Sequence, residues 1–463
     1  MEAISPTFAG IKPQPAPRTA SRSAAMPSLA GFKAASVRLP LCFVLVGVLS
    51  LLVGAGFLLA QPDLLATYHY SPHLIALTHL FVLGFISSIV MGAMYQLVPV
   101  TLQVQLYSER LIKFQLGAHV IGFAGMVFAF WNYNMAAVGW FGTLLTLGAL
   151  LFVFNLVRTL ATVKGWNSIK LGIASALFWL SSTVLAGLLL VATKFWSFST
   201  FMPIAAMHAH AHLGVIGVFV LMIVTVSYKL VPMFTLSELQ SERRAWWSVV
   251  LLNAGLAAVF AAILRQSALK IPSALLLVSS LVLYGVEILA ILRARNRRTL
   301  DWGMRYFLTA IALLIPLSAL AIILCWSGLP VTAFTMQLES VYGVLALLGL
   351  VGLAILGMLY KIVPFLVWFH SYSRHIGRAK VPALGEMYSV PLQVAGYWTY
   401  VTGLLAVAAA TAFSNQMAIR WACALWAVSL LIFAANMARI LVHFVRPKVS
   451  PLTANVPTTR KHI

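Results

Sequence analysis

Long apolar stretches recur along this chain from about residue 39 to about residue 445. Each is about 18 residues or longer, which is enough for a helix to cross a hydrocarbon layer about 30 Å thick. Backbone polar groups in lipid must be satisfied within the chain, and the sequence lacks the short alternating strands of a membrane barrel. We therefore expect an all-α polytopic membrane protein with about twelve transmembrane helices. The expected helices are residues 39–60, 74–99, 114–132, 136–158, 171–193, 203–232, 247–265, 271–292, 305–327, 337–369, 391–412 and 420–445.

The charge distribution supports a membrane protein rather than a nucleic-acid-binding one. The net charge of +22 comes from 31 Lys and Arg against 9 Asp and Glu, in a chain that is 62% hydrophobic. With the expected helices, all but four of the basic residues lie on one side of the membrane. This bias predicts that both termini are cytoplasmic, with anionic membrane lipid as the neighbour and no nucleic acid as a partner. We expect a multi-pass protein of the cell inner membrane. The four exceptions are Lys194, Arg265, Lys270 and Arg420.

The expected helices form one transmembrane domain, residues 39–445, between two basic tails. Residues 1–38 are rich in Pro, Ala and Ser, which predicts a disordered cytoplasmic tail, with a transit peptide as the alternative. Residues 446–463 form a second, shorter tail. The three cysteines form no CxxC or CxxCH motif, which argues against covalently attached haem and against a zinc ribbon.

Three of the expected helices share one sequence pattern. From an opening position to a tyrosine is 16 residues in each copy, a glycine falls five residues after the opening, and the tyrosines are 133 and 132 residues apart. We predict a four-helix unit used three times in parallel, with pseudo-threefold symmetry, over residues 39–158, 171–292 and 305–445. The glycines would allow close helix packing, and the tyrosines would lie at the membrane interface. The openings and tyrosines are His79 and Tyr95, His212 and Tyr228, and Val344 and Tyr360.

Histidines inside the apolar segments are the candidate functional residues. His79 and His212 occupy equivalent places in the first two copies, and ionisable groups within a bilayer are costly and tend to mark function. Imidazole is also the usual axial ligand of haem iron. In the run from His208 through His210 to His212, the first and last share a helix face and His210 points nearly opposite. We expect His79, His210 and His212 to be ligands, and His208 to be either a metal ligand or a residue of the helix start.

The remaining polar residues of the membrane segments have simpler interpretations. His69 and His73 are expected to be interfacial or loop residues, and His119 is expected in an interhelical hydrogen bond. Glu287 and Glu339 are candidate proton relays, with an interhelical bond as the alternative for Glu287. Four histidines on the basic side are expected to be solvated, namely His370, His375, His443 and His462.

At these residues the sequence resembles the haem-copper oxidase subunit I superfamily, in particular its C-type cytochrome c oxidases and nitric oxide reductases. Those proteins have twelve helices in three arcs, and a His-x-His-x-Gly opening on a helix that closes in a Tyr-x-Leu-Val-Pro-like end, as at His210, His212 and Tyr228. His79 matches their second-helix ligand of the low-spin haem. The resemblance implies haem b, electron transfer in a respiratory chain, and a cytochrome c or another respiratory subunit as partner.

The sequence also departs from that superfamily, and this leaves enzymatic activity open. The His-x-His pair lies on the sixth helix instead of the tenth, and no histidine between His212 and His370 supplies the usual copper site. One hypothesis is a haem b protein, with His79 and His212 as axial ligands of one haem and His210 facing a second pocket, able to transfer electrons and open to oxygen or nitric oxide reduction. A second is a haem- or copper-handling or nitric-oxide stress protein, with copper at His208 and His210. A third is a secondary transporter. No catalytic residue is assigned.

Overall fold

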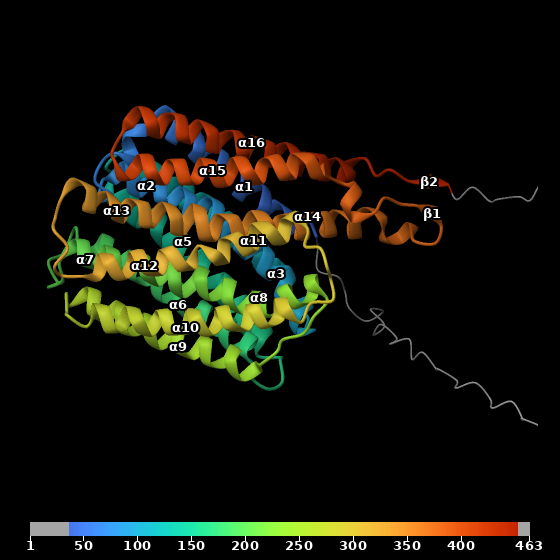
Figure 1. Cartoon of the computed structure of the whole chain (residues 1–463), viewed down its shortest axis with the longest axis horizontal. Helices are drawn as coiled ribbons and strands as arrows, with labels where there is room; N and C mark the ends of the chain where they lie inside the picture. The colour runs from blue at the N-terminus through green and yellow to red at the C-terminus, as the bar shows by residue number, and fades with distance from the viewer. Residues whose placement is uncertain (1–36, 452–463) are drawn as a thin grey trace, which may run out of the picture. The chain divides into compact units, whose positions relative to one another are not determined.

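The computed structural model describes residues 37–451, so most of the two expected tails, residues 1–36 and 452–463, lies outside the described part. Within it, twelve helical spans are long and apolar enough to cross a membrane, at the expected places. The expected all-α polytopic fold is confirmed (Figure 1). Two strands of two residues, β1 (Ala379–Lys380) and β2 (Ser450–Pro451), pair antiparallel.

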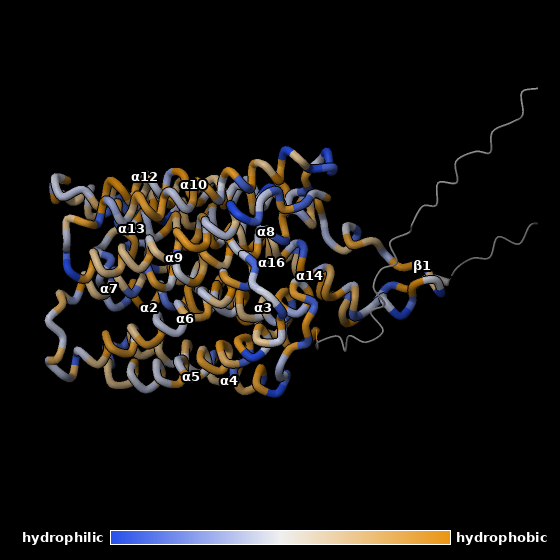
Figure 2. Tube along the Cα trace, turned by 90° about the horizontal axis from the view of Figure 1, so that it is seen from below, coloured by the Kyte–Doolittle hydropathy of each residue, from blue (hydrophilic) through white to orange (hydrophobic). Residues whose placement is uncertain are grey.

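The helices are α1 (Arg38–Ala60), α2 (Pro72–His79), α3 (Ser88–Leu102), α4 (Glu109–Trp131), α5 (Met135–Leu160), α6 (Ser168–Ala192), α7 (Pro203–His212), α8 (Leu221–Thr235), α9 (Glu242–Leu264), α10 (Lys270–Arg293), α11 (Trp302–Ala312), α12 (Leu314–Cys325), α13 (Ala333–Val344), α14 (Leu353–Tyr372), α15 (Val390–Ala412) and α16 (Gln416–Val445). Short 3₁₀ turns occur at Pro62–Leu65, Ser373–His375 and Leu384–Glu386. Figure 2 shows hydrophobic residues along the helices and hydrophilic residues mainly in the connections at their ends.

Polar residues at the helix starts define where many of these apolar runs begin. Their side-chain oxygens accept the backbone N–H three residues later, which satisfies a donor that the helix itself leaves free and contributes about 1 kcal/mol each. Such caps are Ser71, Ser108, Asn134, Asn167, Ser241, Asp301, Thr332, Ser389 and Asn415.

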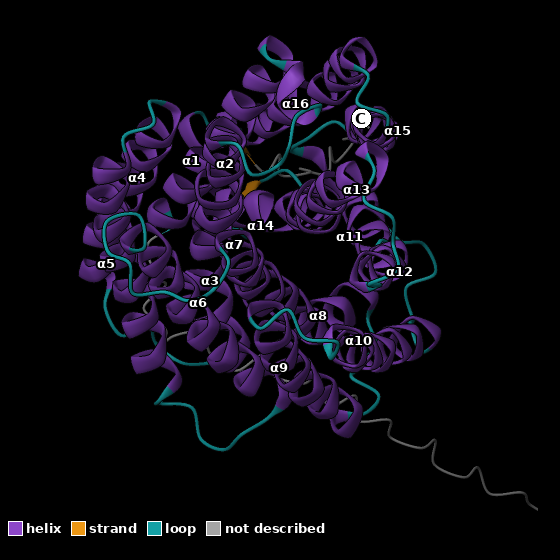
Figure 3. Cartoon of the chain, turned by 90° about the vertical axis from the view of Figure 1, so that its left-hand side faces the viewer, coloured by secondary structure: helices purple, strands orange, loops and turns teal. Residues whose placement is uncertain are grey.

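The three spans that carry the repeated pattern lie on the inside of the helix assembly. Their most apolar windows are 67%, 67% and 78% buried, against 50% or less for the other nine spans found in residues 37–451. In the end-on view of Figure 3, α2, α7 and α13 accordingly lie inside α4, α5, α9, α10 and α15. The residues of the repeated pattern therefore face protein rather than lipid.

Each of these inner spans contains a π-helical segment directly after the opening position. The segments are Leu80–Ser87, Leu213–Val220 and Leu345–Gly352. Their starts are 133 and then 132 residues apart, the same steps as those of the sequence pattern. π-Helical turns are rare and often lie at functional sites. His79 and His212 are thus the last α-helical residues before a π-helical segment.

A second contact recurs near the other ends of the spans. A buried side-chain oxygen accepts the backbone N–H of the residue 47 positions earlier in three places: Asn155 from Ser108 at 3.0 Å, Glu287 from Gln240 at 2.7 Å, and Asn436 from Ser389 at 2.8 Å. Like the π-helical segments, these contacts recur once in each of the three expected units, whose relation as repeats stays a prediction. Glu287 also pairs with Arg244 Nε at 2.7 Å. It therefore forms the interhelical bond that was the alternative for this residue.

The structure confirms the prediction for the glycines Gly84 and Gly217 of the pattern but not the prediction for its tyrosines. A Cβ at Gly84 would lie 2.8 Å from Ser50 Cβ, and one at Gly217 would lie 2.7 Å from Trp179 Cβ, so the close packing expected of these glycines is confirmed. The expected interfacial position of the tyrosines is wrong. The side chains of Tyr95, Tyr228 and Tyr360 are only 1–2% exposed. They lie on inner spans, where protein surrounds them and polar side chains bind their hydroxyls.

Candidate functional site

A cavity of about 590 Å³ lies between the inner spans, and all four histidines selected from the sequence line it. This volume is within the range of about 300–1,000 Å³ that is typical of small-molecule and cofactor pockets. Aliphatic and aromatic side chains from all three expected copies form most of the wall. The polar and charged lining residues include His69, Thr78, His79, Thr183, His208, His210, His212, Lys270, Ser318, Glu339 and Tyr342.

His79 and His212 are held in the same way by their own helices. His79 Nδ1 lies 2.7 Å from the carbonyl oxygen of Ile75, and His212 Nδ1 lies 2.7 Å from that of His208. A carbonyl only accepts, so Nδ1 carries the proton in both rings and Nε2 keeps its lone pair. Neither Nε2 has a hydrogen-bond partner among residues 37–451, and both rings border the cavity. This is the arrangement in which an imidazole can ligate a metal while a carbonyl orients it.

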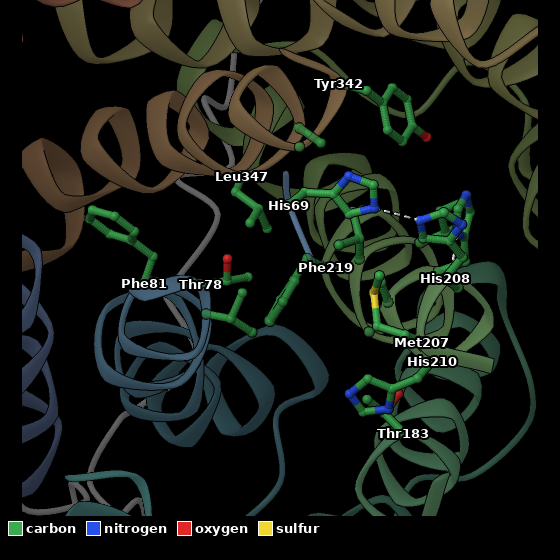
Figure 4. A pocket seen from close by; sticks show the side chains of 18 of the residues that line it. His69, Thr78, Phe81, Thr183, Met207, His208, His210, Phe219, Tyr342 and Leu347 are labelled. Atoms are coloured by element: carbon green, nitrogen blue, oxygen red, sulfur yellow. Dashed lines mark hydrogen bonds between the residues drawn. The ribbon is translucent and has the colours of Figure 1, made fainter. Parts of the chain in front are cut away.

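We call His79, His210 and His212 the inner histidines. Their different neighbours distinguish two gaps within the cavity. The His79 ring stacks on Phe130 of α4, with centroids 5.2 Å apart, and His79 acts electrostatically on His210. His210 lies beside Thr183 and Gly187 of α6 (Figure 4). The ring of His212 instead faces Tyr342 of α13, at 6.3 Å. We infer that His210 shares a gap with His79, whereas His212 borders a neighbouring gap toward α13.

This pattern follows from the repeat positions. Tyr342 stands 132 residues after His210, so it is the equivalent residue of the expected third copy. The opening histidine of the expected second copy, His212, thus faces this position of the expected third copy. The expected opposition of His210 to His212 on α7 agrees with these contacts. The pairing of His79 with His212 on one haem stays a prediction, and the electrostatic interaction of His79 with His210 favours His210 as an alternative partner.

A second group of polar side chains meets at one end of the cavity, where α2, α7 and α13 begin. His69 Nε2 lies 3.0 Å from His208 Nε2 and 3.3 Å from Glu339 Oε2. His208 Nε2 lies 3.9 Å from the same oxygen. Figure 4 shows His208 on α7 pointing toward His69, away from His210. We call His69, His208 and Glu339 the mouth cluster.

Burial and charge set the protonation of the mouth cluster. His69 precedes α2 in a connecting segment, but its side chain is only 14% exposed. Burial lowers the pKa of His69, so its ring is neutral at pH 7. Burial and, second, the carboxylate of Glu339 raise the pKa of Tyr68, the neighbour of His69. Lys270 lines the same cavity and acts electrostatically on His208.

Sequence reasoning found only part of the mouth cluster. The sequence predicts His208 as a candidate metal ligand and Glu339 as a candidate relay, but it predicts only an interfacial or loop position for His69. No spacing in the sequence links these residues, because each comes from a different copy. Three histidines in a short run pointed to His208. Nothing comparable pointed to His69, whose position depends on how the segment before α2 folds over the cavity.

The other histidines have structural roles. His119 is fully buried, and its Nε2 lies 3.0 Å from Ser88 Oγ, which confirms the expected interhelical bond. His73 contacts Tyr133 Oη at 3.3 Å, as suits an interfacial residue. The expected solvation of His443 is wrong. It is 8% exposed, and its Nδ1 lies 2.7 Å from the hydroxyl of Tyr372.

His370 is exposed, as expected, and its ring stacks on Phe444 at 4.5 Å. His375 is half-buried, and His462 lies outside the described residues. Neither a protein-family model nor a curated protein matches this chain.

The cavity offers two kinds of chemistry. The inner histidines present free nitrogens to a space of cofactor size, and the mouth cluster presents two imidazoles and a carboxylate to one point.

Proposed function

We propose that this protein binds haem b in the cavity and transfers electrons, with a fold related to haem-copper oxidase subunit I. One observation carries the proposal. His79 and His212, at equivalent places in two copies, both have Nδ1 fixed by a backbone carbonyl, with Nε2 free beside the cavity. A ring whose Nδ1 is fixed by a carbonyl and whose Nε2 lone pair faces a cavity is arranged as metal-ligating imidazoles are.

The lining suits an iron porphyrin. The volume, the apolar wall and the free imidazole nitrogens fit a flat, largely apolar cofactor that needs one or two axial ligands. In this proposal His79 and His210 would hold the haem iron in their shared gap. His212, beside Tyr342, would hold iron in the neighbouring gap. Bound haem supplies one-electron redox chemistry.

The groups around the proposed ligands orient their rings and exclude water. The Ile75 and His208 carbonyls fix the tautomer and orientation of the two rings, and a hydrogen bond of this kind also raises the basicity of the ligating nitrogen. The stack with Phe130 limits rotation of the His79 ring. The apolar wall excludes water, and burial of this kind is one of the factors that set the potential of a haem.

Positions of the basic residues support a location in the cell inner membrane with both termini in the cytoplasm. In that orientation the mouth cluster lies at the non-cytoplasmic end of the cavity. An electron donor such as cytochrome c, or another respiratory subunit, would then approach this end. These assignments of side and partner belong to the proposal.

A haem- or copper-handling role without oxidase activity remains the second candidate, because no histidine between His212 and His370 supplies the superfamily's copper ligands. Copper held jointly by His208 and His210 is not the arrangement that we propose. His208 meets His69 and Glu339, whereas His210 lies beside α6 on another side of α7.

The proposal is tested by purifying the full chain in detergent from cells supplied with a haem precursor. We expect a b-type α-band in the reduced-minus-oxidised spectrum and at least one haem per chain in a pyridine haemochrome assay. The control is His73→Ala. His73 lies on α2, as His79 does, but its imidazole does not line the cavity. A colourless protein from haem-replete cells, monodisperse and correctly folded, would contradict haem binding.

A further inference from the structure

The mouth cluster joins three parts of the chain that are far apart in sequence. His69 precedes α2, His208 lies on α7 and Glu339 lies on α13, one residue from each expected copy. We propose that these three side chains bind a divalent transition-metal ion. This metal site goes beyond the proposed haem function, because none of the three residues is among the haem ligands proposed above.

The distances fit a common central ion. Ligand atoms at 2.0–2.2 Å from a tetrahedral zinc ion lie roughly 3.3 Å apart. The three separations in the mouth cluster are 3.0, 3.3 and 3.9 Å. All three candidate ligand atoms lie within 4.8 Å of one another, and this is the one group of that kind found in the described part of the chain.

Hydrogen bonds alone satisfy the cluster poorly. Three acceptor atoms face one another: His69 Nε2, His208 Nε2 and Glu339 Oε2. A proton on one imidazole can be donated to only one of the other two atoms in good geometry, which leaves two lone pairs opposed. His69 Nδ1 is buried without a partner in residues 37–451, so nothing there obliges Nε2 to keep the proton. A cation in the centre would satisfy all three atoms at once.

The donor set selects the class of metal. Two imidazoles with one carboxylate suit zinc, copper or iron in their divalent states, whereas calcium and magnesium prefer oxygen ligands alone. Three protein ligands leave coordination positions open, and the ligands line the cavity. The cation of Lys270 opposes metal binding, and the carboxylate of Glu339 offsets this charge.

The experiment uses the full chain in lipid nanodiscs, stripped of metal with a chelator and titrated with Co²⁺. We expect one equivalent of Co²⁺ to give the visible absorption of a low-symmetry nitrogen and oxygen site, and Zn²⁺ to displace it. His69→Ala and the isosteric Glu339→Gln should each weaken binding more than about 100-fold, because even second-shell losses cost about 10–100-fold. The matched control, His73→Ala, should leave the affinity unchanged.

Two results would overturn the metal site: a folded wild-type protein that binds no Co²⁺ or Zn²⁺, or binding that persists unchanged in both His69→Ala and Glu339→Gln. The haem spectrum distinguishes this failure from a failure of the proposed function. Glu339→Gln should lose the metal and keep the b-type α-band of the wild type. Conversely, absence of haem in a wild-type protein that binds Co²⁺ would leave the metal site standing.

Discussion

The inner histidines and the mouth cluster border the same cavity but are positioned by different means. His79 and His212 are each oriented by the carbonyl four residues earlier on the same helix. The mouth cluster exists only when a connecting segment and two helices, from three copies, come together. The first arrangement is local and present before any ligand binds. The second depends on tertiary contacts over the whole length of the chain.

This contrast has an energetic side. A ring fixed by its own helix loses little further freedom when it ligates iron, so affinity is gained from preorganisation. The mouth cluster must hold one carboxylate and two imidazoles together without a helix backbone to fix them. We therefore expect substitutions near the inner histidines to have narrow effects, and substitutions near the mouth cluster to depend on pH and on nearby charge.

The largest effect is expected from removal of the inner ligands. His79→Ala and His210→Ala should each abolish the low-spin b-type signal, a loss of more than about 100-fold in haem affinity, because they share one gap. His212→Ala should retain that signal. Low-temperature electron paramagnetic resonance of the three variants measures this. If His212→Ala loses the signal and His210→Ala keeps it, the pairing of His79 with His212 is the correct one.

A smaller effect is expected from Phe130→Ala, which removes the ring stacked on His79. An aromatic stack is worth about 0.5–1.5 kcal/mol, so haem affinity should fall roughly 2- to 12-fold. Haem titration of the apoprotein gives the value, with Phe128→Ala, a lipid-facing residue of the same helix, as the control. A loss as large as that of His79→Ala would show that α4, rather than the carbonyl of Ile75, orients the ring.

A gain is expected from Lys270→Gln at the mouth cluster. This change removes a positive charge that acts on His208 and should raise the affinity for Co²⁺ a few-fold, since partly exposed charges interact by up to about 1 kcal/mol. The gain should shrink at high salt. Arg265→Gln, at the end of α9, is the control. Unchanged affinity in Lys270→Gln would place the bound ion elsewhere in the cavity.

The smallest effect is expected on the pH dependence of the stability of the metal-free protein. Because burial holds the pKa of His69 below its ordinary 6.5, the unfolded chain binds this proton more readily than the folded one. The contribution of neutral His69 to stability is therefore present above pH 6.5 and is lost as the pH falls from there toward the lowered pKa. Thermal unfolding of His69→Gln should show a weaker decline over this range than the wild type. An identical decline would exclude His69 as its source.

The sequence predicts the features that depend on residues close together along the chain. Apolar length fixed the twelve spans, and the equal spacing of His79 and His212 identified two rings that the structure holds alike. The sequence does not predict positions that depend on contacts between distant segments. Tyr95 has the ring and hydroxyl of an interfacial residue, but its span is an inner one. His69 could be recognised only once the segment before α2 was placed over α7 and α13.

His208 belongs to both regions. Its imidazole is part of the mouth cluster, and its carbonyl oxygen holds Nδ1 of His212 one turn deeper in the bilayer. Any ion that draws the first turn of α7 toward His69 therefore pulls on the hydrogen bond that sets the electron density of the deeper ring. If His212 holds haem as proposed, ion binding at the mouth cluster would then change the redox potential of that haem. By reciprocity, reduction of the buried centre would change how tightly the surface holds its ion.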